Sequence, residues 1–250
     1  MTKTKQFLFT VAAGKKLIAK AMPCLEQIDA ALKNHTVVII SGSTNGYVAE
    51  ELLTQIGQKE NFDKKTFWRG VNAGPNAKLQ KGAYSDCDIV IEKGVWSKGK
   101  TIFDVAQTLG VDDVILKGAN AVQEDRKLAG IQIGNPTFGT SGPILEASLG
   151  KRAQLIIPVG LEKRIFGNIS DIASKINNPS VSGTRILPIG GTIITELEAI
   201  NFITGASAEL VAAGGVFGAE GGYWIAVTGT EEQLDLATEV IKEVQKEPEF

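Results

Sequence analysis

Short uninterrupted apolar runs alternate along the chain with segments in which apolar residues recur at helical spacing. The runs TVVII (36–40), DVIL (113–116) and QLIIPV (154–159) are rich in β-branched residues, which predicts strands buried on both faces of a sheet. TFWRGV (66–71) and CDIVIE (87–92) predict two further strands. Repeated strand–helix–strand units favour parallel pairing with right-handed crossovers. We therefore predict an α/β fold with an open, doubly wound, mainly parallel sheet.

The pattern changes near NNPSVSGT (177–184), where small and polar residues indicate a long loop or linker. Beyond it the chain has the pattern strand, helix, two adjacent strands and helix, which is most of a ferredoxin-like module. We predict a main α/β ligand-binding domain at residues 1–180 and a small ferredoxin-like α+β domain at residues 181–250. The small domain could serve as a lid or as a dimerisation unit, so the sequence leaves open whether the protein forms a homo-oligomer.

Charge and composition exclude several classes of function. The net charge is -2 and no basic block occurs, which argues against a nucleic-acid partner. No run approaches the ~20 apolar residues that span a bilayer. Cys24 and Cys87 lie far apart, as in a cytoplasmic protein with reduced thiols. His35 is the only histidine, which excludes a zinc site built on several imidazoles, and we expect neither a metal nor a cofactor.

A turn rich in glycine and hydroxyl groups, SGSTNG (41–46), follows the first predicted sheet strand, and a helix is expected from Tyr47. A helix N-terminus offers unpaired N–H groups and a positive dipole end to an anion. The candidate ligand-binding residues of this turn are Ser41, Gly42, Ser43, Thr44 and Asn45. The alternative is a tight turn, capped by Thr44 or Asn45, that binds nothing.

Other polar side chains follow predicted strands or precede helices. In open parallel sheets, ligands bind outside the carboxyl ends of the strands, so these side chains are expected to converge on a small anionic metabolite. They are Arg69, a candidate phosphate or carboxylate clamp, together with Lys117, Asn120, Glu124, Asp125, Thr140 and Ser141. The competing interpretations are a surface ion pair for Arg69, an edge lysine for Lys117, and solvated loop acids for Glu124 and Asp125.

SGSTNG, KGANAV (117–122) and a helix leading into LIIPV together resemble the sugar-phosphate isomerase and CoA-transferase-like superfamily, over roughly residues 36–160. Its members include ribose-5-phosphate isomerase, glucosamine-6-phosphate deaminase, initiation factor 2B-related proteins, CoA transferases and the ligand domains of sugar-responsive repressors. The resemblance implies that SGSTNG holds a substrate phosphate. Ribose-5-phosphate isomerase also carries a ferredoxin-like piece, which the C-terminal pattern would suit.

The chain departs from the isomerase pattern both in the acidic motif and in the glycines that follow Lys117. Asn120 stands where relatives carry an Asp of a DGAD-type motif, and an amide can only orient or hydrogen-bond a substrate. Lys117 resembles the Lys of the isomerase KGGG motif and would polarise the substrate. Glu124 and Asp125 would then be the nearby acid–base candidates.

Two other functions stay open, and whether the chain is an enzyme stays open with them. CoA transferases use a Glu at a strand end as a covalent nucleophile, and Glu92 in VIEKG occupies a comparable place. A non-catalytic metabolite-sensing domain would keep the binding site without the acid pair. The favoured prediction is binding of a small phosphorylated or carboxylated metabolite, with isomerase-type chemistry on a sugar phosphate.

Overall fold

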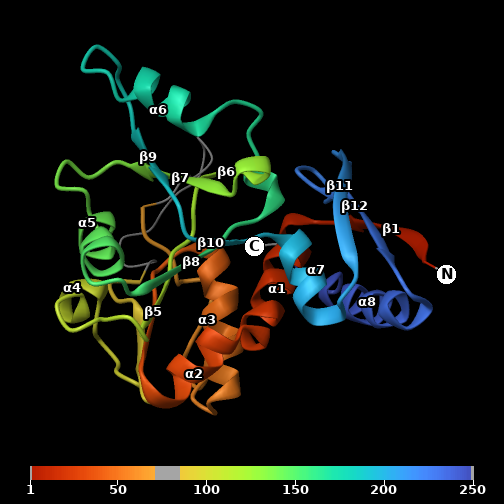
Figure 1. Cartoon of the computed structure of the whole chain (residues 1–250), viewed down its shortest axis with the longest axis horizontal. Coiled ribbons are helices and arrows are strands. Elements are labelled where there is room, and N and C mark those ends of the chain that lie inside the picture. Colours follow the sequence, from red (N-terminus) through yellow and green to blue (C-terminus); the bar gives the residue numbers. More distant parts are fainter. Residues whose placement is uncertain (1, 71–84, 249–250) are drawn as a thin grey trace.

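The structure is a computed structural model that describes residues 2–70 and 85–248. It is a mixed α/β fold in which a six-stranded mixed sheet is accompanied by two antiparallel sheets of three strands (Figure 1). Helices α1, α3 and α7 stand between the six-stranded sheet and the sheet that holds both β1 and β12. None of the helices in the described ranges is long and apolar enough to cross a membrane.

The six-stranded sheet has the order β10-β8-β5-β2-β3-β4. The first four strands in this order are parallel, whereas β3 and β4 are antiparallel to their neighbours. Its strands are β2 (Thr36–Ile39), β3 (Ile89–Glu92), β4 (Val95–Trp96), β5 (Val114–Leu116), β8 (Gln154–Pro158) and β10 (Thr192–Ile194). The α/β class is confirmed, and the sheet is partly parallel.

Strand β2 is buried on both faces, as its unbroken apolar run predicts. Val37 and Ile39 pack into the core on one side, and Val38 and Ile40 pack into the core on the other side. The first side is covered by α1 (Val11–Ala21), η1 (Met22–Cys24), α2 (Glu26–Asn34) and α3 (Ser43–Gln55), and the second by α4 (Ile102–Val105) and α5 (Ser141–Leu145). Helices on both faces leave the strand ends as the place where polar side chains can gather.

Two predicted elements differ from the structure. The predicted strand at residues 66–71 is wrong as far as it is described, because residues 66–70 form turns and coil. Val71 lies outside the described residues. The helix expected from Ser141 into LIIPV ends its regular α part at Leu145 and continues as a wider π-type turn, η3 (Glu146–Gly150).

The second sheet combines the two ends of the chain. It has the order β1-β12-β11, with strands β1 (Lys3–Phe9), β11 (Ser207–Ala213) and β12 (Tyr223–Gly229). Phe9 lies opposite Tyr223, and the two rings stack with centroids 6.1 Å apart. Helices α1, α7 (Glu196–Thr204) and α8 (Glu231–Val244) pack on this sheet. The N-terminal strand therefore completes a sheet whose other strands lie beyond residue 200, while the two-domain division stays a prediction.

The third sheet lies beside the carboxyl ends of β8 and β10 (Figure 1). Its order is β6-β7-β9, with strands β6 (Ala121–Gln123), β7 (Leu128–Ile133) and β9 (Arg185–Ile189). One face packs against Ile157, Val159 and Ile193, and the other is covered by α6 (Ile169–Ile176). Residues 177–184, predicted as a linker, form the exposed connection from α6 to β9.

Candidate functional site

The parallel strands β2, β5, β8 and β10 bring the residues that follow them to one edge of the six-stranded sheet. These residues are Ser41 after β2, Lys117 after β5, Gly160 to Lys163 after β8, and Thr195 and Glu196 after β10. The backbone hydrogen bond from Lys117 N–H to the Ile156 carbonyl (3.0 Å) continues the ladder to this edge. We call it the carboxyl edge, and it holds most of the buried charge described below.

Asp88 anchors one end of the carboxyl edge. Its side chain is fully buried. One carboxylate oxygen accepts a hydrogen bond from the Ser41 N–H (3.0 Å) and pairs with the Arg69 guanidinium group. The other oxygen accepts from the Ile102 N–H (2.9 Å). The Asp88 carboxylate thus binds two backbone N–H groups and one guanidinium group, and these contacts fix the end of β2 and the position of Arg69.

Lys117 lies among charges of both signs at the end of β5. Burial lowers the pKa of Lys117 to about 8, and the positive charges of Arg69 and Lys163 act in the same direction against the negative charge of Asp88. Its side chain still keeps partial access to solvent. Among the described residues, the Lys117 ammonium group has no hydrogen-bond or ion-pair partner. A cation held this way can meet an anion or a carbonyl group that enters from solvent.

Lys163 links the loop after β8 to helix α3. It ends the short 3-10 turn η4 (Leu161–Lys163). Its Nζ donates a hydrogen bond to Thr44 Oγ1 (3.2 Å) and lies 3.4 Å from Glu162 Oε1. Lys163 therefore joins the cations at the end of β5 to the carboxylates at the ends of β8 and β10.

A buried carboxylate pair occupies the other end of the carboxyl edge. Glu196 is fully buried, and it accepts hydrogen bonds from the Tyr223 hydroxyl (2.7 Å) and from the Leu161 N–H (2.9 Å). Burial and the negative charge of Glu162 raise the pKa of Glu196 to about 7, against the effect of these two hydrogen bonds. Neither buried carboxylate oxygen of Glu162 accepts a hydrogen bond from the described part of the chain. The pair can hold and release a proton near neutral pH.

Two glycines make room for this pair. A β-carbon at Gly14 in α1 would lie 1.9 Å from the Tyr223 hydroxyl oxygen and 2.5 Å from Glu196 Oε1. A β-carbon at Gly160 would lie 1.9 Å from Glu162 Oε2. Both positions are therefore closed to larger residues while the carboxyl groups keep these places.

The SGSTNG turn enters the helix earlier than expected. Helix α3 begins at Ser43 with Gly42 as its N-cap, so the prediction of a helix start at Tyr47 is wrong. Asn45 is fully buried and donates from Nδ2 to the carbonyls of Ile40 (2.8 Å) and Leu116 (2.9 Å). It ties the end of β2 to the end of β5, so the side chain that was predicted to meet a ligand also has a structural task.

Some buried polar atoms near Asp88 and Asn45 have no hydrogen-bond partner among the described residues. Ser41 Oγ and Asn45 Oδ1 have no hydrogen-bond partner within the described ranges, and both side chains are almost completely buried. Arg69 Nε also lacks such a partner. Unsatisfied buried polar groups are uncommon, and they occur where a ligand or water completes the hydrogen bonding.

Several predicted site residues lie away from these charges. Glu124 and Asp125 form the tip of the β6–β7 hairpin in the turn η2 (Glu124–Arg126), where Glu124 pairs with Lys127. Asp125 is exposed. Asn120 precedes β6, and its Oδ1 accepts from the Gln132 N–H (3.0 Å). The hairpin tip reaches α7 through the Lys127–Glu198 ion pair (2.6 Å).

Thr140 and Ser141 begin helix α5 on the face of the sheet covered by α4 and α5. Thr140 is the N-cap without a side-chain hydrogen bond, and Ser141 is buried. Helix α5 has only five residues, so its dipole is weak. Within the described ranges, no hydrogen bond joins either hydroxyl to a charged group of the carboxyl edge.

Glu92 lies at the opposite edge of the sheet. Because β3 is antiparallel to β2, Glu92 pairs in register with Thr36, the first residue of β2. Its carboxylate pairs with Lys100 (2.7 Å) and accepts from the Ser97 hydroxyl. Asp113 lies at this edge too, where it accepts from the Thr36 N–H (2.7 Å). Glu92 therefore does not join Lys117.

Sequence reasoning missed five residues of the carboxyl edge, namely Asp88, Glu162, Lys163, Glu196 and Tyr223. Three of them had a visible signal, since Glu162 and Lys163 come shortly after the predicted strand QLIIPV and Glu196 follows TIIT. The rule that ligands gather after parallel strands applies to them as well as to Lys117. Tyr223 lies on β12 of another sheet, and no local pattern predicts that it reaches Glu196.

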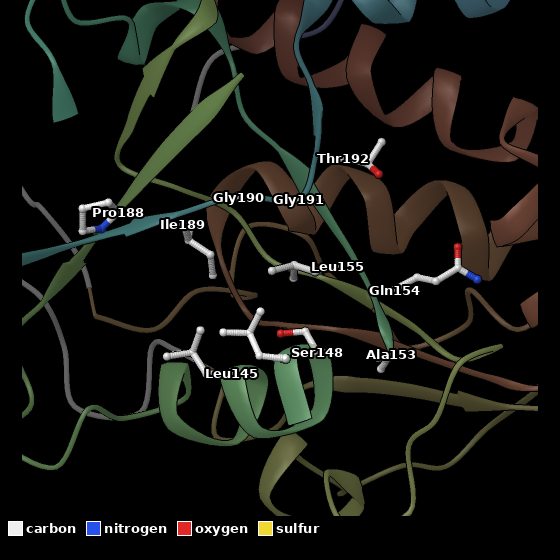
Figure 2. Close-up of a pocket in the computed structure, with 11 residues that line it drawn as sticks. Leu145, Ser148, Ala153, Gln154, Leu155, Pro188, Ile189, Gly190, Gly191 and Thr192 are labelled. Carbon is white, nitrogen blue, oxygen red and sulfur yellow. The ribbon is translucent and has the colours of Figure 1, made fainter. Parts of the chain in front are cut away.

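A separate groove of about 490 Å³ lies between helix α5 with its following turn and strand β8 with the β9–β10 turn (Figure 2). Its apolar lining includes Leu145, Leu149, Leu155 and Ile189, and Gly190 and Gly191 form part of its wall. Among the described residues, no charged side chain lines this groove. It is therefore a poor place for an anionic ligand, in contrast to the carboxyl edge.

Within residues 2–70 and 85–248, no group of three or more His, Cys, Asp or Glu side chains is arranged to hold a metal ion. Comparison of the chain with protein-family models, with curated proteins and with solved structures gives no match in any of the three.

Proposed function

We propose that the carboxyl edge of strands β2, β5, β8 and β10 binds a small phosphorylated or carboxylated metabolite. The observation that carries this proposal is the position of Lys117 at the end of β5, where the positive charges of Arg69 and Lys163 both act on it. Like charges placed together in a protein interior oppose each other, and an anion between them removes that cost.

The charges present at the edge leave room for such an anion. Both carboxylate oxygens of Asp88 accept backbone hydrogen bonds, and one of them also pairs with Arg69. The negative charge of Asp88 therefore balances the positive charge of Arg69 and not that of Lys117. Glu162 pairs with Lys163, at 3.4 Å. Among the described residues, Lys117 has neither a hydrogen-bond partner nor an ion-pair partner. Ser41 Oγ adds a buried hydroxyl in need of a hydrogen bond.

The chemistry that suits these groups is proton transfer next to a carbonyl group, as in the isomerisation of a sugar phosphate. Lys117 would polarise the carbonyl oxygen, and the charge that develops there would be stabilised by the same cations. Glu162 has a buried carboxylate without hydrogen bonds from the described residues, which is the state that a general base requires. Glu196 would hold a proton beside it.

The family and the finer details of the fold that the sequence suggests are also proposals. We infer membership of the sugar-phosphate isomerase and CoA-transferase-like superfamily, with a doubly wound arrangement around the parallel strands and a ferredoxin-like unit near the C-terminus. Support comes from the position of Lys117 at the end of β5, a strand that pairs parallel with β2. We also propose a cytoplasmic location, which the two widely separated cysteines, Cys24 and Cys87, favour.

A metabolite-sensing domain is the second candidate, and one observation favours it. The acid–base residues predicted for an isomerase, Glu124 and Asp125, lie on an exposed hairpin tip, where Glu124 is engaged by Lys127. A sensor needs the cations but no base. Hydrogen exchange into a bound sugar phosphate in D₂O separates the two, because only an isomerase labels the carbon beside the carbonyl group.

Thermal unfolding with a panel of ligands tests the binding proposal. The panel contains inorganic phosphate, sugar phosphates, short carboxylic acids and CoA thioesters. A ligand present at about 100 times its dissociation constant stabilises the folded state by roughly 2.7 kcal/mol, which is readily measured. We expect a sugar phosphate to raise the melting temperature, and failure of every anion to do so would contradict the proposal.

Matched variants locate the binding. Lys117→Met and Lys163→Met each remove one cation of the carboxyl edge and should weaken binding by roughly 10- to 100-fold, the value of a charged hydrogen bond. Lys33→Met is the control, because Lys33 pairs with Asp29 on the surface at the end of α2, which leads into the start of β2. Equal loss of binding in all three variants would indicate a general charge effect and would overturn the proposed location.

A further inference from the structure

Strand β11 forms a free edge of the sheet that the two chain ends build. The order of that sheet is β1-β12-β11, so among the described residues β11 pairs with another strand on one side only (Figure 1). Its seven residues, Ser207–Ala213, make it as long as β1 and β12. The backbone N–H and C=O groups on the outer side of such a strand can pair with a strand from another chain.

The β11 edge carries fewer protective features than the other described edges. Strands β4, β6 and β10 have only two or three residues, β9 carries Pro188, and β1 carries Lys3 and Lys5. Short length, proline and lysine all disfavour the addition of a strand to an edge. The features of this kind in β11 are the acid Glu209 and a bulge at Val211. Without lysine, arginine or proline, β11 is the long edge most open to pairing.

Exposed apolar side chains accompany this edge. The register with β12 shifts between Leu210 and Ala212, which leaves Val211 outside the pairing and 49% exposed. Trp224 on β12, opposite Ala212, is 39% exposed. Helix α7 packs beside β11 and carries Phe202, which is 44% exposed. The sheet and the neighbouring helix therefore both offer apolar surface close to the free strand, as interaction surfaces do.

We propose that β11 pairs antiparallel with β11 of a second copy of this chain, which joins the two three-stranded sheets into one across a two-fold axis. An antiparallel strand pair has two-fold symmetry, so a strand can pair with its own copy. With the axis between Leu210 and Val211, Glu209 lies opposite the partner's Ala212. The two Glu209 carboxylates are then not opposed, and the pairing avoids the repulsion of like charges across strands.

A second copy suits this edge better than a strand of another protein because it closes the assembly. The dimer uses the β11 edge of both copies, and the outer edges of the joined sheet are then the two β1 strands. Those strands carry Lys3 and Lys5, which oppose further addition. The interface is independent of the proposed anion site, since β11 contributes no residue to the carboxyl edge.

The mass of the intact chain in solution, measured by sedimentation from micromolar to near-millimolar concentrations, tests this interface. We expect wild type to show a monomer–dimer equilibrium. Val211→Lys brings two like charges together across the two-fold axis and should raise the dissociation constant of the dimer roughly 100-fold or more. Val111→Lys is the matched control, because Val111 is an equally accessible valine in the turn before β5, and it should leave the dimer intact.

Hydrogen exchange of the wild-type chain gives a second measurement that needs no variant. The amides of Ser207–Ala213 should become more protected as the protein concentration rises, whereas those of Lys3–Phe9 should not change. A monomer at every concentration would overturn the proposal and leave the edge to a strand of another protein. A dimer that survives Val211→Lys, or one whose concentration-dependent protection lies at the apolar groove beside Leu149, would also overturn it.

Discussion

The Tyr223 hydroxyl donates a 2.7 Å hydrogen bond to Glu196 across the boundary between two sheets. Tyr223 belongs to β12, and Glu196 follows β10 at the carboxyl edge of the six-stranded sheet. The bond ties the sheet built from the two chain ends to the candidate site. Changes at either residue should therefore alter both the stability of the fold and the proton held at the site.

Glu196 should make the protein less stable as the pH rises from about 4.5 toward about 7. Its pKa is higher in the folded state than in the unfolded chain, so the folded state binds more protons in this interval and stability falls with rising pH. The fall should be on the order of 3 kcal/mol. Urea unfolding at several pH values measures it, and the difference in stability between wild type and Glu196→Gln should change across this interval. A constant difference would contradict the assignment.

Lys117 should make the folded state more stable as the pH rises, at higher pH than the interval in which Glu196 acts. Its pKa is lower in the folded state than in the unfolded chain, so the unfolded state binds more protons between pH 8 and pH 10.5, and stability rises with pH there. Comparison of wild type with Lys117→Met by urea unfolding isolates this contribution. The variant should gain stability relative to wild type below pH 8, and that gain should shrink toward pH 10.5.

Gly14→Ala should destabilise the protein strongly. The new methyl group would lie 1.9 Å from the Tyr223 hydroxyl oxygen and would push apart the hydrogen-bonded pair. Overpacking of this kind costs typically 1–3 kcal/mol, and the strained buried hydrogen bond adds to that cost. Gly150→Ala is the matched control, since a β-carbon there meets no atom within 4 Å. Equal effects of the two substitutions in chemical unfolding would refute the close packing at Gly14.

Asp88→Asn should weaken the fold and make Lys117 more acidic. The amide keeps one acceptor oxygen, so either Ser41 N–H or Ile102 N–H loses its partner, and Arg69 loses its counter-charge. Removal of one partner of a buried ion pair costs about 3–5 kcal/mol. Because Asp88 raises the pKa of Lys117, the pH midpoint of Lys117 labelling by an amine reagent should fall in the variant. A midpoint unchanged from wild type would show that the two groups do not interact.

The sequence predicted those parts of the fold that local patterns determine. The apolar runs located β2, β3, β5 and β8, because burial of a strand on two faces leaves an unbroken apolar pattern. The pattern carries no information about direction, however, and β3 pairs antiparallel with β2. Nor does it reveal that β1, at the other end of the chain, is the partner of β12.

The candidate site was predictable only where residues directly follow a predicted strand. Lys117 and Ser41 were found by that rule. Arg69 comes from a predicted strand whose described residues, 66–70, form turns and coil, and it reaches the same place through its pair with Asp88. Glu124 and Asp125 were chosen for their nearness to Lys117 in sequence, but the hairpin of β6 and β7 carries them to an exposed tip. An acid–base role for Glu124 and Asp125 stays a prediction. Glu162 is the stronger candidate, because its carboxylate oxygens are buried.

The most direct test of the proposed binding edge is an amide-resolved NMR titration of the whole chain with a sugar phosphate that stabilises it. We predict that chemical-shift changes concentrate at residues 41–45, 117–118, 160–163 and 195–196, the segments that follow the four parallel strands. Thr36, Glu92 and Asp113, at the opposite edge, should remain unchanged. Changes centred on those three residues or on the apolar groove beside Leu149, with a silent carboxyl edge, would contradict the account.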